Sequence, residues 1–90
     1  MVASTAYDIM RLTIRLFALH REIAGRDAYI IDVPDGSTVA DAFALVCSEF
    51  PGIAKTGRTA AFAVNRAHVG GDAPLADGDE LAILPPVAGG

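Results

Sequence analysis

The residues of this sequence that could do chemistry lie at its end, where Pro85-Pro86-Val87-Ala88-Gly89-Gly90 finishes on a Gly-Gly pair. Adjacent prolines cannot continue a strand, because each lacks a backbone N–H and has a fixed φ. We therefore expect residues 85–90 to leave the domain as a projecting tail. Glycine has no side chain, so the end of such a tail fits a narrow channel in another protein. The group at the tip is the α-carboxylate of Gly90.

A terminal carboxylate has a pKa near 3.5 and is ionised at pH 7. It is a poor acyl electrophile but a competent nucleophile toward the α-phosphate of ATP, and the acyl-adenylate that results carries a good leaving group. A sulfur donor would convert it to a thiocarboxylate, and an amine would convert it to an amide or isopeptide. In both cases this chain is modified and other proteins catalyse, so the sequence leaves open whether it counts as an enzyme. A frayed terminus is the alternative.

Other candidate sites are weaker. His20 and His68 lie far apart, with no carboxylate or cysteine at a metal-ligand spacing. Cys47 falls on the apolar stripe of an expected helix, which favours a core residue over a nucleophile. The acidic residues within 77–80 lack the spacing of a calcium loop. No helix pattern follows Gly70-Gly71, so a phosphate cradle is disfavoured.

Composition narrows the class of protein. Ninety residues, 52% of them hydrophobic and 20% charged, indicate one small globular domain. The net charge of −4 and the single lysine, Lys55, disfavour nucleic-acid binding. One cysteine excludes an internal disulfide and fits a reducing compartment. The sequence contains neither a membrane-spanning run nor a signal-peptide pattern, so we expect a cytoplasmic protein with no membrane partner. Since no other cluster of residues suits a ligand, we also expect no bound cofactor or metal.

The tail would project from a folded domain, and the sequence of the first half of that domain predicts two strands and a helix. Residues 1–9 have no periodicity, so we expect a flexible N-terminal extension and a domain over 10–84. Residues 11–18 alternate, with Leu12, Ile14 and Leu16 on one face, and 28–33 form a second strand after a loop at 19–26. Thr38, with Asp41 three residues later, predicts a capped helix that Pro51-Gly52 ends.

The second half predicts three further strands. After a loop at 53–58, residues 60–64 form a strand, Asn65-Arg66 a turn, 68–69 a short return strand and 80–84 the last strand. This order predicts an α+β fold with one main helix packed across a mixed sheet of four to five strands. The first and last strands are the most continuously apolar, so we expect them to pair in parallel at the centre, which is the β-grasp, or ubiquitin-like, arrangement.

The ending Leu75-Ala76-Asp77-Gly78-Asp79-Glu80-Leu81-Ala82-Ile83-Leu84-Pro85-Pro86-Val87-Ala88-Gly89-Gly90 resembles that of the small subunits of molybdopterin synthase, which are ubiquitin-like sulfur carriers. Weaker similarities extend this resemblance over nearly everything after Met10. They lie at Leu16-Phe17-Ala18, Arg21-Glu22, Ala24-Gly25, Thr38-Val39 and Ala63-Val64-Asn65.

The resemblance implies a sulfur carrier. An E1-like activating enzyme would adenylate Gly90 with ATP and magnesium, and a sulfur donor would then give the thiocarboxylate. The tail, Pro85 to Gly90, would enter the large subunit of molybdopterin synthase in a heterotetramer. There the sulfur would pass to cyclic pyranopterin monophosphate, with the catalytic side chains on the large subunit.

Strand alternation places Phe17 away from the core, and one of Ile83 and Leu84 should also face outward. We expect these residues, chiefly Phe17 and Leu84, to form an apolar docking patch around the tail. Ordinary sheet packing is the alternative. The family often has an aromatic pair where this chain has Ile83-Leu84, which leaves the fit of the patch open.

Three other functions stay open. A thiamine-pathway sulfur carrier also ends in Gly-Gly, although its tail usually lacks two prolines. A ubiquitin-like modifier would join Gly90 to protein lysines, and the single Lys55 gives few sites for self-linked chains. A β-grasp interaction module would use no chemistry at its end.

Overall fold

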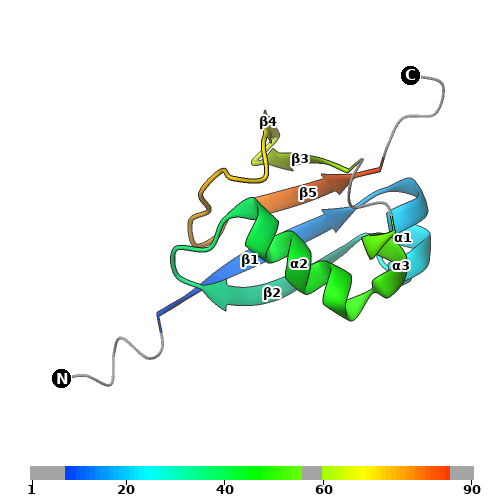
Figure 1. Cartoon of the computed structure of the whole chain (residues 1–90), viewed down its shortest axis with the longest axis horizontal. Helices are drawn as coiled ribbons and strands as arrows, with labels where there is room; N and C mark the ends of the chain where they lie inside the picture. Colours follow the sequence, from blue (N-terminus) through cyan, green and yellow to red (C-terminus); the bar gives the residue numbers. More distant parts are fainter. Residues whose placement is uncertain (1–7, 56–59, 86–90) are drawn as a thin grey trace.

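The computed structural model describes residues 8–55 and 60–85, which form a five-stranded mixed sheet and three helices (Figure 1). The sheet order is β2-β1-β5-β3-β4. Its central pair, β1 with β5, is parallel, and the other pairs are antiparallel. The strands are β1 (Ile9–Leu16), β2 (Ala28–Pro34), β3 (Ala61–Val64), β4 (Ala67–Val69) and β5 (Glu80–Leu84). The α+β class and the parallel pairing of first and last strands are confirmed.

The first strand begins earlier than the domain start expected at Met10. Ile9 lies opposite Pro34, and the backbone N–H of Asp35 donates to the carbonyl of Asp8 at 3.0 Å. The sequence places the start at Met10 because the apolar alternation begins there, whereas ladder hydrogen bonds use the backbone of any residue. The expected extension over 1–9 is therefore corrected at residues 8 and 9, and residues 1–7 lie outside the described part of the chain.

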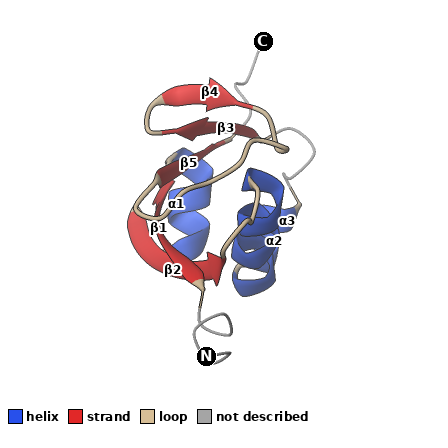
Figure 2. Cartoon of the chain, turned by 90° about the vertical axis from the view of Figure 1, so that its left-hand side faces the viewer, coloured by secondary structure: helices blue, strands red, loops and turns tan. Residues whose placement is uncertain are grey.

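The core lies between one face of the sheet and the helices (Figure 2). Along β1, every second side chain is at most 2% exposed, as the alternation predicts. Removing such side chains from water supplies most of the driving force for folding. The residues that are buried on this face of β1 are Met10, Leu12, Ile14 and Leu16.

The main helix, α2 (Val39–Glu49), has the predicted capping box. The Asp41 N–H donates to Thr38 Oγ1 at 3.3 Å, and the Thr38 N–H donates to Asp41 Oδ2 at 2.9 Å. These bonds satisfy two donors that a helix start leaves without partners. The apolar stripe of the helix faces the sheet, with Val39, Ala42 and Val46 fully buried and Phe43, Cys47 and Phe50 partly buried.

A short helix, α1 (Ala18–Ala24), replaces the loop that was expected over 19–26. It ends at Gly25, whose φ of 74° allows its N–H to reach the Arg21 carbonyl at 2.9 Å. His20 is fully buried on this helix. The prediction was wrong because seven residues offer too little periodicity to reveal a helix whose stability comes from packing.

A second correction concerns residues 51–54. The main helix does end before Pro51, but Pro51 then opens α3 (Pro51–Ala54) at a first-turn position that tolerates proline. Ile53 is fully buried there, although the sequence placed it in a loop. The rest of that expected loop, residues 56–58, lies outside the described residues.

Candidate functional site

The end of the chain is anchored through the middle of the sheet. β5 pairs with β1 on one side and β3 on the other, and it ends at Leu84. Pro85 follows in no regular element and is half-buried. The other tail residues singled out from the sequence, Pro86, Val87, Ala88, Gly89 and Gly90, lie outside the described residues. The described part therefore fixes where the tail leaves the domain (Figure 1).

The turn before β5 sets the register of this strand. Asp77 Oδ1 accepts from the Arg11 N–H at 2.7 Å, and Asp79 Oδ2 accepts from the Ala76 N–H at 2.8 Å. Asp79 Oδ1 also accepts from Asn65 Nδ2 at 2.9 Å. The Asp77 carboxylate therefore ties this turn to β1, whereas the Asp79 carboxylate braces the turn itself and links it to Asn65. The turn that the sequence predicts at residues 77–79 is confirmed by these bonds.

The sheet face opposite the helices carries an exposed apolar surface beside the exit of the tail. Phe17, extended at φ −133° and 37% exposed, follows Leu16, and Leu84 follows Ile83, the parallel partner of Leu16. Register partners share a face of the sheet. We call this surface the outer apolar patch; it consists of Phe17, Leu84, Ala61 and Ala82, and Ala63, which shares this face, is only 7% exposed.

Ile83 does not belong to the outer apolar patch. Its side chain is 0% exposed and lies in the core, opposite Leu16 on β1 and Phe62 on β3. Its assignment as a docking residue was wrong, because consecutive strand residues point to opposite faces and Leu84 takes the outward position. Phe17 and Leu84 each follow a member of the register pair Leu16–Ile83, so they belong to the same face of the sheet, and their role in docking stays a prediction.

Arg15 is a charged residue of this face that the sequence analysis did not single out. Its Nη1 donates to Glu80 Oε2 at 3.3 Å, and its guanidinium carbon lies 5.5 Å from the centre of the Phe17 ring. Arg15 is the register partner of Ala82, so it borders the outer apolar patch. Strand alternation places Arg15 and Phe17 on one face, two residues apart, but it does not distinguish Arg15 from any other solvated strand residue.

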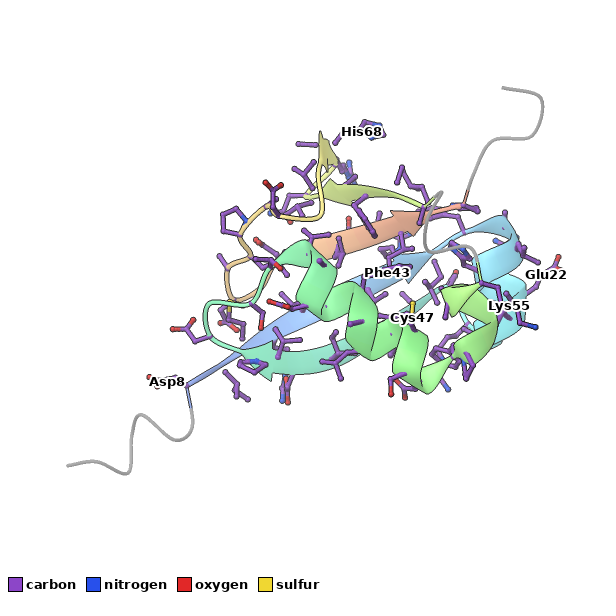
Figure 3. The ribbon with its side chains drawn as sticks, viewed as in Figure 1. Asp8, Glu22, Phe43, Cys47, Lys55 and His68 are labelled. Carbon is purple, nitrogen blue, oxygen red and sulfur yellow. The ribbon has the colours of Figure 1, made fainter. Side chains whose placement is uncertain are left out.

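The histidines and the cysteine that the sequence offered as candidate site residues do not come together in one site. His20 is buried on α1, whereas His68 is exposed on β4 (Figure 3). Cys47 is half-buried on α2, and burial raises the pKa of its thiol, which disfavours the nucleophilic thiolate. Among the described residues, no group of three or more histidine, cysteine or acidic side chains could hold a metal ion. In the same part of the chain, no helix is long and apolar enough to cross a membrane.

One hollow lies away from the tail. It is an open depression at the turn between β2 and α2, lined by Pro34, Asp35, Gly36, Ser37, Asp41 and Leu45. Pro34 pairs with Ile9, at the start of β1, whereas the tail leaves beside the end of β1. The hollow and the tail exit therefore belong to opposite ends of the sheet (Figure 1).

The central parallel pair, the antiparallel flanks and the single main helix define a ubiquitin-like β-grasp protein. Solved structures agree: SAMP1 from Haloferax volcanii superposes with a TM-score of 0.76 at 29% identity, over 89% of this chain and 99% of that one. The model of the ThiS family matches residues 14–90, so this chain belongs to the ThiS family.

Several relatives carry a more specific name. The molybdopterin synthase sulfur carrier subunit of Chlamydomonas reinhardtii is 34% identical, over 90% of this chain and all of that protein. Its Dictyostelium discoideum counterpart is 36% identical, over 86% of this chain and 93% of that protein. Small archaeal modifier protein 3 of Haloferax volcanii is 33% identical, over 90% of this chain and all of that protein.

One structural neighbour is part of an assembly. It belongs to the complex of subunits 1 and 2 of molybdopterin-converting factor from Helicobacter pylori. The superposition has a TM-score of 0.63 at 27% identity, and it covers 90% of this chain and 100% of the neighbour.

Proposed function

We propose that this chain is the sulfur-carrier subunit of a molybdopterin synthase and that it carries sulfur as a thiocarboxylate on Gly90. The observation that carries the proposal is the end of β5. The strand is held by both neighbours up to Leu84, and the sequence beyond it contains no side chain capable of acid–base or metal chemistry. The working group is then the terminal carboxylate. The named relatives support sulfur as its cargo.

The chemistry proceeds in two balanced steps before transfer. The Gly90 carboxylate attacks the α-phosphate of ATP and forms an acyl-adenylate, with pyrophosphate as the leaving group. A donor that supplies sulfur at the oxidation level of sulfide then attacks the acyl carbon and displaces AMP. The activating enzyme provides ATP, magnesium and the catalytic groups, and this chain provides the acyl terminus.

Transfer takes place on the large subunit of the synthase. The thiocarboxylate sulfur attacks a side-chain carbon of cyclic pyranopterin monophosphate and displaces an oxygen substituent of that carbon, which gives a thioester between the pterin and Gly90. Water then cleaves the acyl C–S bond, so Gly90 returns to a carboxylate and the sulfur stays on the pterin. Because a dithiolene holds two sulfur atoms, each product consumes two loaded carriers. The Helicobacter pylori complex of subunits 1 and 2 supports a large-subunit partner.

The test is intact mass spectrometry after incubation with ATP, magnesium, an activating enzyme and a sulfur donor. We expect a mass gain equal to the replacement of one oxygen by sulfur, located at Gly90. Mixing the product with the large subunit and the pterin precursor should then yield molybdopterin. A variant with one alanine added after Gly90 should fold but remain unloaded. Loading of the extended variant would contradict the proposal.

A modifier is the second candidate, because Small archaeal modifier protein 3 covers as much of this chain as the named carriers do. In that case the same experiment would give a ladder of larger conjugates through lysine amines instead of a single loaded species. A thiamine-pathway carrier would be loaded at Gly90 but would yield no molybdopterin with the large subunit.

A further inference from the structure

Arg11 and Arg15 lie on the same face of β1, but their side chains differ in how many hydrogen bonds they make. Arg11 donates from Nε to Asp32 Oδ1 at 3.0 Å and from Nη2 to Asp32 Oδ2 at 3.4 Å. Within the described residues, Arg15 makes one side-chain hydrogen bond, from Nη1 to Glu80 at 3.3 Å. Its Nε is shielded from solvent and has no hydrogen-bond partner among the same residues. The guanidinium of Arg15 therefore keeps donors that the domain does not satisfy.

Arg15 and its unsatisfied donors lie near the point where the tail leaves the sheet. The sheet register places the small residue Ala82 beside Arg15, and Ala63 lies one strand further away. Phe17 holds Arg15 from the other side, with the guanidinium carbon 5.5 Å from the ring centre. Arg15 is thus a fixed cation next to apolar surface, close to where the chain leaves the sheet after Leu84. Arg11 lies four residues back along β1, about 13 Å from Arg15.

We propose that Arg15 is a specificity-determining residue for the protein that receives the tail. In this assembly its guanidinium pairs with a carboxylate of the partner, while an apolar partner side chain lies over the partly exposed Ala82. This inference rests on the proposed function, since the partner is the large subunit of the synthase.

The physical reason is desolvation. In the free chain, water satisfies the exposed donors of Arg15, whose side chain is 37% exposed. A partner that covers the outer apolar patch removes this water, and a buried donor without an acceptor is costly. A partner carboxylate meets the planar donor edge of the guanidinium in two-point geometry. A partner without an acceptor at this place is rejected, which gives selectivity as well as affinity.

The experiment measures the Kd of the full chain for the large subunit by isothermal titration calorimetry. Arg15→Gln should weaken binding about 10–100-fold, because it leaves the partner carboxylate buried and unpaired. Arg15→Lys keeps the charge but not the planar fork, so its Kd should lie between those of Arg15→Gln and the unmodified chain. Arg11→Gln, on the same face but away from the tail, is the matched control and should stay within about twofold of the unmodified chain.

Salt dependence separates a direct contact from a structural role. Raising the salt concentration should weaken binding of the unmodified chain more steeply than binding of Arg15→Gln. Circular dichroism of each variant checks the fold. If Arg15→Gln and Arg11→Gln bind equally well, or if both variants keep the salt slope of the unmodified chain, the inference is wrong. The unmodified chain could instead self-associate as its concentration rises. If Arg15→Gln lost this self-association but still bound the large subunit normally, Arg15 would belong to a contact between copies of the chain, and the inference would also be wrong.

Loading at Gly90 is measured separately by mass spectrometry. If the unmodified chain acquires sulfur on Gly90 and Arg15→Gln binds the large subunit normally, the inference about Arg15 is wrong but the proposed function stands. An unmodified chain that neither acquires sulfur nor binds the large subunit overturns both proposals.

Discussion

Leu16 and Ile83 face each other across the central parallel pair of strands, and both side chains are buried, at 1% and 0% exposure. The residues that follow them, Leu84 on β5 and Phe17 in extended backbone just after β1, point to the opposite face of the sheet. On each side of the pair, one residue therefore packs in the core, and the residue after it lies on the other face, where a partner could contact it. This alternation makes the two roles separable by mutation.

Ile83→Ala should lower the free energy of unfolding by about 2–5 kcal/mol, because it leaves a cavity in the core. Leu84→Ala, from a half-buried position, should cost less than about 2 kcal/mol and should weaken binding of the large subunit. Urea denaturation measures the first effect and calorimetric titration the second. A Leu84→Ala variant that is destabilised as strongly as Ile83→Ala would place Leu84 in the core.

The start of α2 offers a second test of stability. Thr38→Ala removes the side-chain oxygen that accepts from the Asp41 N–H, and it should cost about 1 kcal/mol. Ser48→Ala, at an exposed position near the end of the same helix, is the matched control and should change stability by less than about 0.5 kcal/mol. Both values come from urea denaturation at pH 7. Equal effects would mean that the cap contributes nothing beyond helix propensity.

The sequence predicted the sheet well because its strands alternate with a period of two. Leu12, Ile14 and Leu16 could be assigned to the core from spacing alone, and Thr38 with Asp41 marked the helix start. Alternation could not decide between Ile83 and Leu84, because both are apolar and the face that each residue takes depends on the register with β1. The register is held by bonds between β1 and the turn before β5, from the Arg11 N–H to Asp77 Oδ1 and from the Thr13 N–H to the Asp79 carbonyl, which side-chain patterning does not report.

The outer apolar patch was only half predictable for a similar reason. Phe17 is conspicuous because a large apolar side chain on the solvent side of a strand is unusual. Ala63 and Ala82 carry no signal in the sequence, since their importance is that they are small and lie next to each other across two strands. Arg15 looks like any solvated strand residue until its contacts with Glu80 and Phe17 are known.

Asn65 links the turn between β3 and β4 to the start of β5. Its backbone has a φ of 50°, its Nδ2 donates to Asp79, and its Oδ1 accepts from the Glu80 N–H at 3.0 Å. Asn65→Gly keeps the left-handed backbone accessible but loses both side-chain bonds, and it should cost about 1–2 kcal/mol. Asn65→Ala loses the bonds and strains the backbone, so it should cost about 1 kcal/mol more.

Urea denaturation of the two Asn65 variants separates the contributions of side chain and backbone. Asn65→Gly should also shift the amide resonances of Asp79 and Glu80, because these residues lose their side-chain contact. If both variants unfold like the unmodified chain, the turn does not contribute to holding β5 in register.

Tyr29 gives the domain a sensitivity to alkaline pH. Burial, followed by the nearby negative charge of Glu49, raises the pKa of Tyr29 from 10.0 to about 12. The ring packs edge-on against Phe50 at 5.7 Å, and the hydroxyl is buried with no hydrogen-bond partner among the described residues. Between pH 10 and pH 12 the folded chain therefore binds more protons at this site than the unfolded chain does. This contribution to stability is complete below pH 10 and is lost as the pH rises through about 12.

Tyr29→Phe should remove this part of the alkaline loss of stability while keeping the ring contact with Phe50. At pH 7 it should be neutral or slightly stabilising, because it deletes a buried hydroxyl that makes no hydrogen bond within residues 8–55 and 60–85. The free energy of unfolding in urea, measured at intervals from pH 8 to pH 12, should fall less steeply in Tyr29→Phe than in the unmodified chain. Tyr7→Phe is the control, since it removes the only other tyrosine and leaves Tyr29 as the single phenol for spectrophotometric titration. A pKa near 10 for Tyr29 in this control would contradict its burial.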